Sequence, residues 1–410
     1  MQMTVAEAII RFLQEEGVEV IFGYPGGAVI GFYDALYNSS LKHVLVRHEQ
    51  GAAHAADGYA RSTGKVGVCV ATSGPGATNL VTGIATAYMD SVPLIAITGQ
   101  VRTSAIGKDS FQEVDTRGIT MPITKHNYLL TNPHEVLKIF KEAFYIANTG
   151  RKGPVLIDIP ADIFVTKIEY SYPSKIDLTG YKPNYEPHPL QIKRAAQLIK
   201  ESEKPIILAG GGIISSEASE ELIKFAEKIN TPVVTTLMGK GAIPETHELY
   251  CGFIGMHGAA YANYAINDSD LIIAIGVRFS DRSTGRVDTF APNAKIIHID
   301  IDPAEIGKNV QPLVPIVADA KRALQKLIEV VEPKTNPLWW EKIKEWKTNY
   351  PLRYRMDLEE IKPQYVIERI YELTKGEAIV VTEVGQNQMW AAQYYKVKRP
   401  RQFISSGGLG

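Results

Sequence analysis

Short apolar runs separated by amphipathic segments recur along the first 170 residues. Runs of this length, bounded by turn residues, are typical of buried strands, and the segments between them have a helical period. The alternation predicts βαβ units, in which helices cover both faces of a parallel sheet. The expected strands are VEVIF (18–22), HVLV (43–46), VGVCVAT (66–72), PLIAIT (93–98) and PVLIDIP (154–160).

The first residues of the chain are expected to form a helix. Thr4 and Glu7 have the spacing of a capping box, and an apolar stripe that includes Ile9 and Phe12 follows. Because charged residues such as Arg11 interrupt the apolar stretch, a signal peptide is excluded. No run approaches the length of a membrane span. We therefore expect a cytoplasmic protein without a membrane partner.

A second alternation of strands and helices follows an irregular segment rich in Pro and Tyr, residues 171–189. Its expected strands are residues 205–212, 231–237, 270–276 and 295–302, and a helix is expected near residues 319–331. Residues 332–361 contain EPKTNP and paired tryptophans and are interpreted as a second linker.

The sequence ends on the glycine-rich turn SGGLG, shortly after a predicted helix at 363–374 and a predicted strand EAIVVTEVG. We therefore expect a third α/β domain that is incomplete. The expected organisation is a first domain at 1–170, a linker at 171–189, a central domain at 190–331, a linker at 332–361 and the start of a third domain at 362–410.

Composition narrows the function classes. A chain of 410 residues is too long for one ordinary core. The net charge of −1 gives no sign of a nucleic-acid or anionic membrane partner. The two cysteines, Cys69 and Cys251, lie far apart without metal-ligand spacing, which argues against a disulfide scaffold and a structural zinc site.

Ligands of parallel sheets bind at the carboxyl ends of the strands, so the residues that follow each strand are the candidates for chemistry. Glu49 follows HVLVR and opens a helix of small residues. A carboxyl near a helix N-terminus can have its pKa tuned and can share a proton. The alternative is an acid that only stabilises the helix dipole. In SGPGATN (73–79) backbone amides can hold an anion or a carbonyl, although many α/β turns contain Gly and Pro.

The central domain offers weaker signals. AGGG (209–212) is not a GxGxxG fingerprint, but it lets a backbone approach a phosphate or ribityl chain. Asp300 ends a strand, where an acid commonly binds a ribose hydroxyl, and Arg278 can serve a diphosphate. Structural turns without a ligand are the alternative interpretation of all three features.

The order of motifs closely resembles that of the large catalytic subunit of acetolactate (acetohydroxyacid) synthase, a thiamine-diphosphate enzyme family. The resemblance covers essentially all 410 residues. The motifs are IFGYPGGA, RHEQGAAHAADGYAR, TSGPGATNLVTGIATAY, ITGQV, SAIGKDSFQE, KGPVLIDIP, AGGG, TLMGKG, GMHG, GVRFSDR, HIDIDPAEIGKN, VGQNQMW and SGGLG.

The resemblance implies a three-domain architecture of parallel sheets flanked by helices. The first domain would bind the cofactor's aminopyrimidine, and the central Rossmann-like domain would bind FAD as a structural ligand. The third, truncated here, would bind diphosphate and Mg²⁺. The implied reaction is decarboxylation of pyruvate and transfer of the hydroxyethyl group to pyruvate or 2-ketobutyrate. This is the first common step of valine, leucine and isoleucine biosynthesis.

By the same resemblance, Glu49 hydrogen-bonds the pyrimidine N1′ and is the catalytic residue. The implied thiamine-diphosphate residues are Tyr24, Pro25, Gly26, Gly27, Ala28, Glu49, Pro75, Asn79, Val384, Gly385, Gln386, Asn387 and Gly410, with Phe111 and Gln112 in the substrate channel. The implied FAD residues are Arg151, Gly210, Gly211, Gly212, Thr235, Leu237, Met256, His257, Gly258, Gly276, Arg278, Asp300, Ile301, Asp319 and Ala320.

The family also implies a homodimer or higher oligomer, since a glutamate of one subunit meets the diphosphate domain of its partner, and a small regulatory subunit is a further expected partner. The small residues after Glu49 suit close packing at such an interface.

The sequence departs from the family pattern in three places. Arg102 stands where many members have Pro, and Ala161 stands where many have Lys; both positions lie toward the substrate channel in relatives. The metal signature GDG followed by NN is absent from these residues, so we expect no metal ligands in this chain and no activity of the truncated chain alone.

Two other interpretations remain. Thiamine-diphosphate pyruvate oxidases and 2-keto-acid decarboxylases share the architecture, and their products would be acetate and acetaldehyde. A non-catalytic flavin-binding module would bind FAD without releasing CO₂ from pyruvate.

Overall fold

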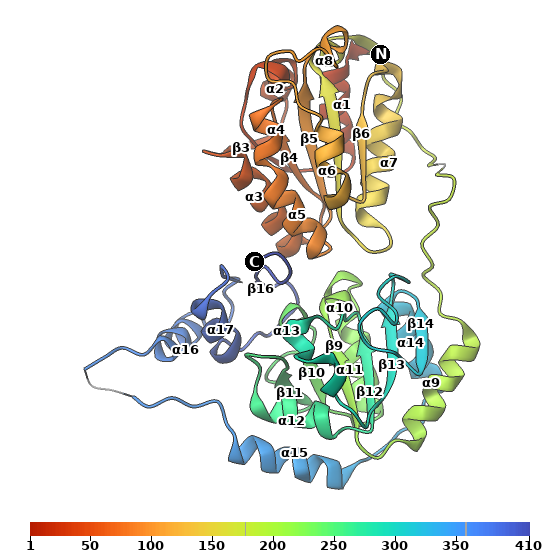
Figure 1. The fold of residues 1–410 in the computed structure, drawn as a ribbon, viewed down its shortest axis with the longest axis vertical. Helices are drawn as coiled ribbons and strands as arrows, with labels where there is room; N and C mark the ends of the chain where they lie inside the picture. Colours follow the sequence, from red (N-terminus) through yellow and green to blue (C-terminus); the bar gives the residue numbers. More distant parts are fainter. Residues whose placement is uncertain (177, 357–358) are drawn as a thin grey trace. The chain divides into compact units, whose positions relative to one another are not determined.

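A parallel sheet of six strands forms the centre of the first unit of the computed structural model (Figure 1). The structure describes residues 1–176, 178–356 and 359–410, and the first unit comprises Met1–Lys182 with Gly408–Gly410. The strand order is β3-β2-β4-β5-β7-β6. The bounds are β2 (Val20–Gly23), β3 (Lys42–Leu45), β4 (Gly67–Ala71), β5 (Leu94–Gln100), β6 (His126–Leu129) and β7 (Pro154–Pro160).

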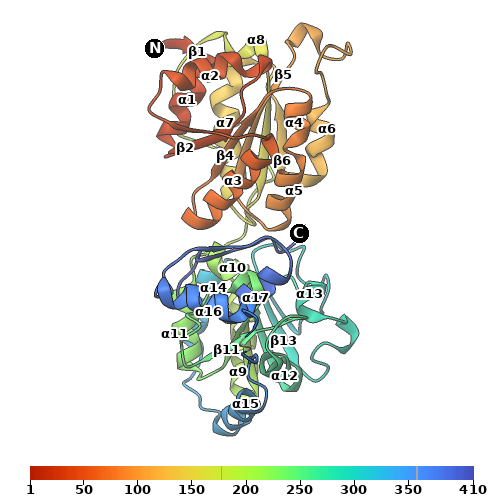
Figure 2. The same cartoon turned by 90° about the vertical axis from the view of Figure 1, so that its left-hand side faces the viewer.

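Helices cover both faces of this sheet (Figures 1 and 2). Successive side chains of a strand point to opposite faces. Val68 and Val70 of β4 pack in the core under α1, α2 and α7, whereas Cys69 and Ala71 pack under α3 and α5. The bounds are α1 (Val5–Glu15), α2 (Ile30–Tyr37), α3 (Glu49–Thr63), α4 (Pro75–Asn79), α5 (Val81–Met89), α6 (Thr116–Thr120), α7 (Val136–Asn148) and α8 (Ala161–Phe164).

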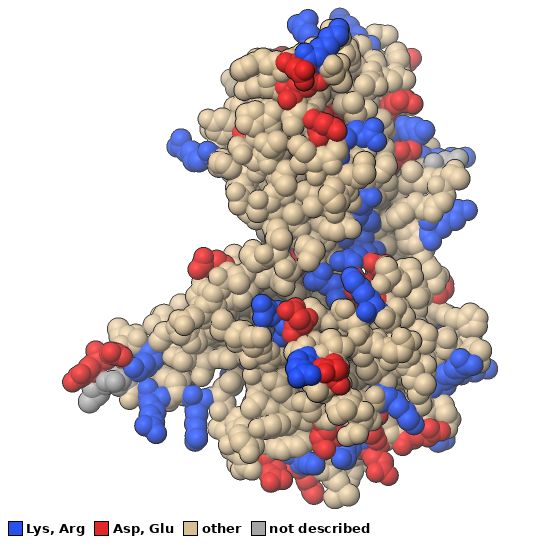
Figure 3. Space-filling model, in the orientation of Figure 1, with Lys and Arg blue, Asp and Glu red and all other residues tan. Residues whose placement is uncertain are grey.

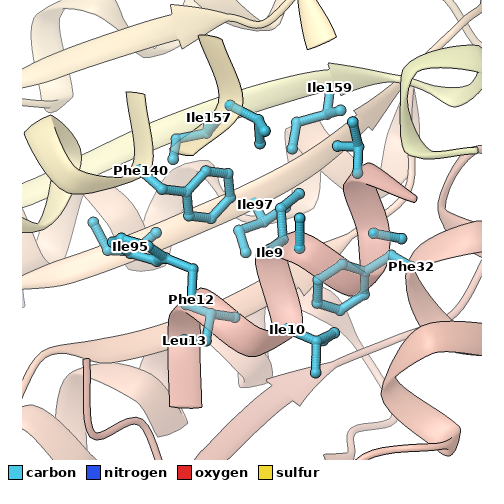
Figure 4. Close-up of a cluster of buried hydrophobic side chains, with 14 of the residues drawn as sticks. Ile9, Ile10, Phe12, Leu13, Phe32, Ile95, Ile97, Phe140, Ile157 and Ile159 are labelled. Atoms are coloured by element: carbon cyan, nitrogen blue, oxygen red, sulfur yellow. The ribbon is translucent and has the colours of Figure 1, made fainter. Parts of the chain in front are cut away.

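The first of these cores contains aromatic rings from four helices, α1, α2, α7 and α8. Phe12 of α1 and Phe140 of α7 lie over Ile95 and Ile97 of β5 (Figure 4), with the ring centroids 6.0 Å apart in an edge arrangement. Such contacts bury large apolar areas and stabilise the layer. The capping box predicted for α1 is confirmed, because the Thr4 hydroxyl accepts from the Glu7 amide while the Glu7 carboxylate accepts from the Thr4 amide. A short antiparallel pair, β1 (Gln2–Thr4) and β8 (Lys167–Glu169), joins the two ends of this unit.

The second unit, Pro183–Gly407, contains another six-stranded parallel sheet with the order β11-β10-β9-β12-β13-β14. Helices α9, α11 and α14 cover one face, and α12 and α15 cover the other. The strands are β9 (Pro205–Ala209), β10 (Val233–Thr235), β11 (Tyr250–Phe253), β12 (Leu271–Ile275), β13 (Lys295–Asp300) and β14 (Val314–Val317). The helices are α9 (Pro189–Glu201), α10 (Gly211–Ser215), α11 (Ser219–Lys228), α12 (Ala260–Asp268), α13 (Asp281–Thr284), α14 (Ala320–Val330) and α15 (Pro337–Asn349).

Helix α15 lies in the segment 332–361 that was interpreted as a linker. Its Trp339 and Ile343 are buried against the sheet. The Trp339 indole N–H also donates to the Pro205 carbonyl over 3.0 Å. This segment therefore forms a helix that packs on one face of the second sheet. Its helical period in the sequence is weak, but burial of the tryptophan surface stabilises the helix.

The remaining residues of the second unit form a small parallel pair of strands and two helices. These are α16 (Pro363–Leu373), β15 (Val380–Val381), α17 (Gln386–Tyr394) and β16 (Phe403–Ile404). The helix predicted at 363–374 and the strand predicted in EAIVVTEVG are both present, the strand as two residues only.

The predicted fold class, parallel sheets flanked by helices, is confirmed. Both acidic and basic side chains lie on the face drawn in Figure 3. Among the described residues, no helix combines the length and the hydropathy that crossing a bilayer requires.

Candidate active site

The direction of winding reverses between β2 and β4 in the first unit. The chain passes from β2 to β3 on one side and then returns to β4 on the other. Loops that leave neighbouring strands in opposite directions open a crevice at the carboxyl end of the sheet, which is where open α/β sheets bind ligands. The residues that border this point are the loop after β2, the turn after β4 and the start of α3.

Glu49 is the first residue of α3 and its side chain is half-buried. The Asn79 side-chain amide donates to the Glu49 carboxylate over 2.9 Å between Nδ2 and Oε2. Asn79 ends α4, so residues 30 positions apart in sequence meet at one point. This bond fixes the orientation of the carboxylate from the β4 side of the crevice, which a helix-dipole role for Glu49 would not require.

Two glycines leave the backbone bare beside this carboxylate. A Cβ added at Gly76 would lie 2.7 Å from Thr72 Cγ2 and 3.5 Å from Glu49 Oε1. A Cβ added at Gly26 would lie 2.5 Å from Thr72 Cβ. The Ala28 amide donates to the Thr72 hydroxyl over 3.2 Å. Thr72 therefore joins the two loops, and a larger residue than glycine at position 26 or 76 would force them apart.

The structure thus brings together the first-unit residues predicted around Glu49. Tyr24 and Pro25 are exposed, and Gly27 faces open space among the described residues. Pro75 is exposed at the first position of α4. Thr72 was not singled out from the sequence, although it is the first polar residue after β4 and that position is the signal for it.

The predicted channel residues lie on a loop that packs against the β4 turn. A Cβ added at Gly74 would lie 2.8 Å from the Gln112 carbonyl oxygen, and Gln112 itself has a φ of 58°. Phe111 is 88% exposed, so its ring projects from the loop. The Glu113 carboxylate accepts from the Gly107 and Ser110 amides, and these hydrogen bonds, chiefly that of Ser110, lower the pKa of Glu113.

Arg102 and Ala161, which depart from the family pattern, are the sequence neighbours of Thr103 and Asp162, and these two residues are hydrogen-bonded to each other. The Asp162 carboxylate accepts from the Thr103 amide over 2.9 Å and from the Thr103 hydroxyl over 2.5 Å. The side chains that replace Pro and Lys of the family pattern therefore adjoin a common anchoring point at the start of the loop.

A buried carboxyl, that of Asp158, lies on β7 beside Thr98 and Gln100 of the neighbouring strand β5. Asp158 of β7 is 1% exposed and accepts from the Thr98 hydroxyl over 2.7 Å and the Gln100 side-chain amide over 2.9 Å. Burial raises the pKa of Asp158 to about 7, because desolvation outweighs these neutral donors.

This carboxyl makes stability depend on pH. Between its ordinary pKa near 4 and its folded pKa near 7, Asp158 keeps a proton in the folded state that the unfolded chain has released. The folded state therefore loses stability as pH rises through this window, by about 4 kcal/mol at most. Asp158→Asn should remove this component. From pH 4.5 to pH 7.5, the free energy of unfolding in urea should fall more for the wild type than for the variant. The same pH dependence in both proteins would contradict the assignment.

The second unit has a reversal of winding between β9 and β12, with bare backbone at that point. A Cβ added at Gly212 would lie 2.5 Å from Gly276 Cα, and one added at Gly210 would lie 2.1 Å from the Gly276 carbonyl oxygen. The Gly212 amide donates to that same oxygen over 3.2 Å. The glycines are thus required for close packing of the two turns, as well as for any ligand.

The predicted FAD residues of this unit all follow the carboxyl ends of its strands. Thr235 ends β10 and Asp300 ends β13, and both are buried, while Arg278 lies in the loop after β12. Gly211, Leu237, Met256, His257, Gly258, Ile301 and Ala320 lie in the turns or helix starts that follow β9, β10, β11, β13 and β14.

Two acids among the predicted FAD residues accept hydrogen bonds from other residues of the protein. The Asp319 carboxylate accepts from the Arg322 amide as the N-cap of α14 and from the Ser216 hydroxyl over 2.6 Å. The Asp300 carboxylate accepts from the Asp302 amide over 2.9 Å.

The remaining predicted residues lie elsewhere. Arg151 precedes β7, at the amino end of the first sheet, and its guanidinium donates to the Ser91 hydroxyl over 2.9 Å. It is therefore not part of the Glu49 crevice. Val384, Gly385, Gln386 and Asn387 lie between β15 and the first turn of α17, and Gly410 is the last residue of the chain.

Three regions of the chain match domains of thiamine pyrophosphate enzymes. Residues 3–119 match the N-terminal TPP binding domain, residues 192–327 the central domain and residues 383–410 the C-terminal TPP binding domain. The glycine-lined crevice with Glu49 lies within the first of these matches. The chain therefore belongs to the class of thiamine pyrophosphate enzymes.

Similarity to individual proteins narrows the class. The chain is 57% identical to a probable acetolactate synthase large subunit of Methanocaldococcus jannaschii, over 99% of this chain and 71% of the relative. It is 54% identical to the acetolactate synthase large subunit of Corynebacterium glutamicum, over 100% of this chain and 66% of the relative. It is 53% identical to the acetolactate synthase of Mycobacterium leprae, over 100% of this chain and 67% of the relative.

The chain belongs to the acetolactate synthase large-subunit family, which confirms the resemblance drawn from its motifs. It spans about two thirds of the length of these relatives.

Proposed function

We propose that the protein acts as an acetolactate synthase, decarboxylating pyruvate on thiamine diphosphate and transferring the two-carbon unit to pyruvate or 2-ketobutyrate. The observation that carries the proposal is the Glu49 carboxylate, held by Asn79 at the β2–β4 reversal beside the bare backbone of Gly76. Family membership supports the same reaction.

The residues fit the aminopyrimidine of this cofactor. Bound thiamine diphosphate supplies an electron sink for the decarboxylation of a 2-keto acid. Glu49 would hold a proton at the pyrimidine N1′, and the hydrogen bond from Asn79 keeps the carboxylate oriented for it. Gly26 and Gly76 carry no side chain, so a flat ring can approach the backbone there. Tyr24 and Phe111 are exposed apolar residues near this crevice and would exclude water from the substrate.

Product analysis separates this proposal from its nearest alternatives. Pyruvate, thiamine diphosphate and Mg²⁺ supplied to the protein with a complete C-terminal TPP binding domain should yield acetolactate, detected as acetoin after acid treatment. Acetaldehyde as the main product would favour a decarboxylase, and acetate formed with consumption of oxygen would favour a pyruvate oxidase. Binding of FAD without release of CO₂ would favour a non-catalytic flavin module.

FAD is the second proposed ligand, bound in extended form at the β9–β12 reversal as a structural cofactor. Support comes from the bare backbone of Gly210 and Gly212 and from Arg278 and Asp300 at the ends of adjacent strands. We propose that Arg278 neutralises the diphosphate and that Asp300 or its backbone binds the adenosine end. Arg151 is also proposed to contact FAD, as the family pattern implies.

A flavin titration tests this proposal. Flavin absorbance should co-purify with the protein and should not bleach on addition of pyruvate. Arg278→Met should lower the affinity for added FAD, whereas Arg286→Met, an exposed arginine paired with Asp288 in the same region, should leave it unchanged. A chain that neither binds FAD nor gains thermal stability from it would contradict the assignment.

Mg²⁺ is proposed as the partner of the diphosphate. Within the described ranges, no three His, Cys, Asp or Glu side chains gather in a way that would hold a metal ion, so no step is assigned to it. The proposed thiamine-diphosphate contacts of Val384–Asn387 and Gly410 likewise rest on the family pattern.

We further propose a homodimer or higher oligomer, and a small regulatory subunit as an additional partner. Support comes from the edge strand β3, where Val44 and Leu45 are 43% and 59% exposed. Of the small residues after Glu49, Ala52, Ala53 and Ala56 are buried inside the first unit, whereas Gly51 is exposed and Ala55 is half-buried, so only these last two are available to such an interface. Sedimentation of the active enzyme should give at least a dimer, and Leu45→Glu should shift it toward monomer.

A further inference from the structure

The loop that carries Phe111 and Gln112 is anchored at both of its ends, by Asp162 of α8 and by Gln100 at the end of β5. Asp162, two residues past β7, binds the amide and hydroxyl of Thr103 at the start of the loop. At the other end the Gln100 side-chain amide donates to the Val114 carbonyl over 2.8 Å. Both ends of the segment 101–114 are therefore hydrogen-bonded to residues at the carboxyl ends of the neighbouring strands β5 and β7.

Gln100 can act as this anchor because all of its hydrogen-bonding groups are engaged. Its Nε2 donates one proton to Val114 and the other to Asp158 over 2.9 Å, while its Oε1 accepts from the Val101 amide over 2.9 Å. Gln100 is 4% exposed, so its bonds are made away from water. The backbone determines which way the amide faces, since the Val114 carbonyl can only accept, and does so from Nε2, while the Val101 amide can only donate, and does so to Oε1.

The chemistry of Asp158 supports a role beyond stability. The donors that meet its carboxylate, Thr98 and Gln100, are neutral, and its raised pKa shows that the site costs the ionised form free energy. Burying an acid without a countercharge destabilises a fold. A leucine of similar size would complete the same core more favourably, which makes a positioning role for the acid worth testing.

We infer that Asp158 and Gln100 are positioning residues that hold the 101–114 loop, and with it Phe111 and Gln112, in place for the second keto acid. The inference rests on the proposed synthase reaction. Glu113, through Gly107 and Ser110, stiffens the middle of the loop, and the positive φ of Gln112 is maintained by its contact with Gly74. Anchoring in this way lowers the entropy that the bound substrate would otherwise have to remove from the loop.

Loop opening can be measured on the chain itself, independently of any activity. Gln100→Met keeps the volume of the side chain but removes the bridge, and Asp158→Asn keeps the shape but offers one acceptor in place of two. Hydrogen exchange of the peptide covering 103–114 should accelerate about tenfold or more in Gln100→Met and by a smaller factor in Asp158→Asn. Chymotrypsin cleavage after Phe111 should accelerate in parallel. Exchange in α3 should not change.

The matched control is Asp109→Asn, which removes an exposed acid of the same loop that lies outside the anchors. It should leave loop exchange and cleavage at the wild-type rate. Wild-type exchange in both anchor variants would overturn the inference. Should Gln100→Met fail to fold, the near-isosteric Asp158→Asn decides the question.

The active enzyme supplies the second readout. In Gln100→Met the kcat/KM for acetolactate formation should fall about tenfold or more, with the ratio of products from pyruvate and 2-ketobutyrate altered. Exchange of the cofactor C2 proton should stay at the wild-type rate, because Glu49 is not part of this loop. A mobile loop with unchanged kcat/KM and product ratio would overturn the positioning role. A wild-type enzyme that makes no acetolactate would instead refute the proposed function, while the exchange data would still decide whether the anchors exist.

Discussion

In the protein with a complete C-terminal TPP binding domain, Glu49→Gln is expected to lower acetolactate formation by roughly 10²–10⁴-fold, the range of general acid–base assistance. Glutamine keeps the size of the side chain, and its Oε1 can still accept from Asn79, so the 2.9 Å contact that orients Glu49 survives. What is lost is the ability to exchange a proton with the pyrimidine N1′. Exchange of the thiamine C2 proton, followed by NMR, should slow in parallel with turnover.

Binding measurements separate this loss of chemistry from a loss of structure. Affinity for thiamine diphosphate should fall much less than turnover, and FAD content should be unchanged because Glu49 is not among the proposed FAD residues. Glu19→Gln is the matched control, since Glu19 is an exposed carboxylate paired with Lys65 before β2. Wild-type C2 exchange in Glu49→Gln would show that the carboxylate only stabilises the helix dipole.

The sequence predicted the central strands of both sheets and missed most of the edges. β4, β5, β9 and β12 are buried on both faces, so each is a continuous apolar run that stands out in the sequence. The missed strands β6, β11 and β14 are all edge strands. Each of the three has only four residues, and β6 (HNYL) is partly polar, while β11 (YCGF) contains a glycine and β14 (VPIV) a proline, and these features weaken the strand signal. The bounds of the predicted domains remain predictions.

The site was predictable wherever a residue follows a strand that the sequence predicted. Glu49, Gly26 and Asn79 were identified in this way, and the structure brings the three into one crevice. The Asp158–Gln100 pair was not identified, because a buried acid within an apolar run has the same sequence pattern whether it faces a helix or a loop. Its partner set follows from strand register, which pairs Thr98 with Asp158 and which local sequence does not specify.

Arg61→Met is expected to destabilise the first unit by about 3–5 kcal/mol, the range for breaking a buried ion pair. The Arg61 guanidinium donates to Asp57 over 2.5 Å on its own helix and to Asp90 over 2.8 Å at the end of α5. The three side chains are 11%, 8% and 0% exposed. Burial raises the pKa of Asp57, and the positive charge of Arg61 opposes that rise. Methionine keeps the apolar stem and leaves two acids buried without their cation.

The pH dependence of this loss identifies its cause. Without Arg61 the folded pKa of Asp57 should rise further, so the folded variant retains protons that the unfolded chain has released. The loss of unfolding free energy in Arg61→Met, relative to the wild type, should therefore be smaller at pH 5 and larger at pH 8. Restoring neutrality with Asp57→Asn and Asp90→Asn in the Arg61→Met background should recover part of the stability at pH 8.

Hydrogen exchange of β4 and β5 measures the stability of the first unit, while the fluorescence of the protein reports on the second. The four tryptophans, Trp339, Trp340, Trp346 and Trp390, all lie in the second unit, so the tryptophan unfolding transition should not move in Arg61→Met. The matched control is Arg11→Met, which removes an exposed arginine paired four residues along α1 with Glu15 at 3.1 Å. Exposed pairs of this kind contribute about 1 kcal/mol or less. An Arg61→Met variant that lost no more than the Arg11→Met control would show that the buried network does not stabilise the helix on which Glu49 stands.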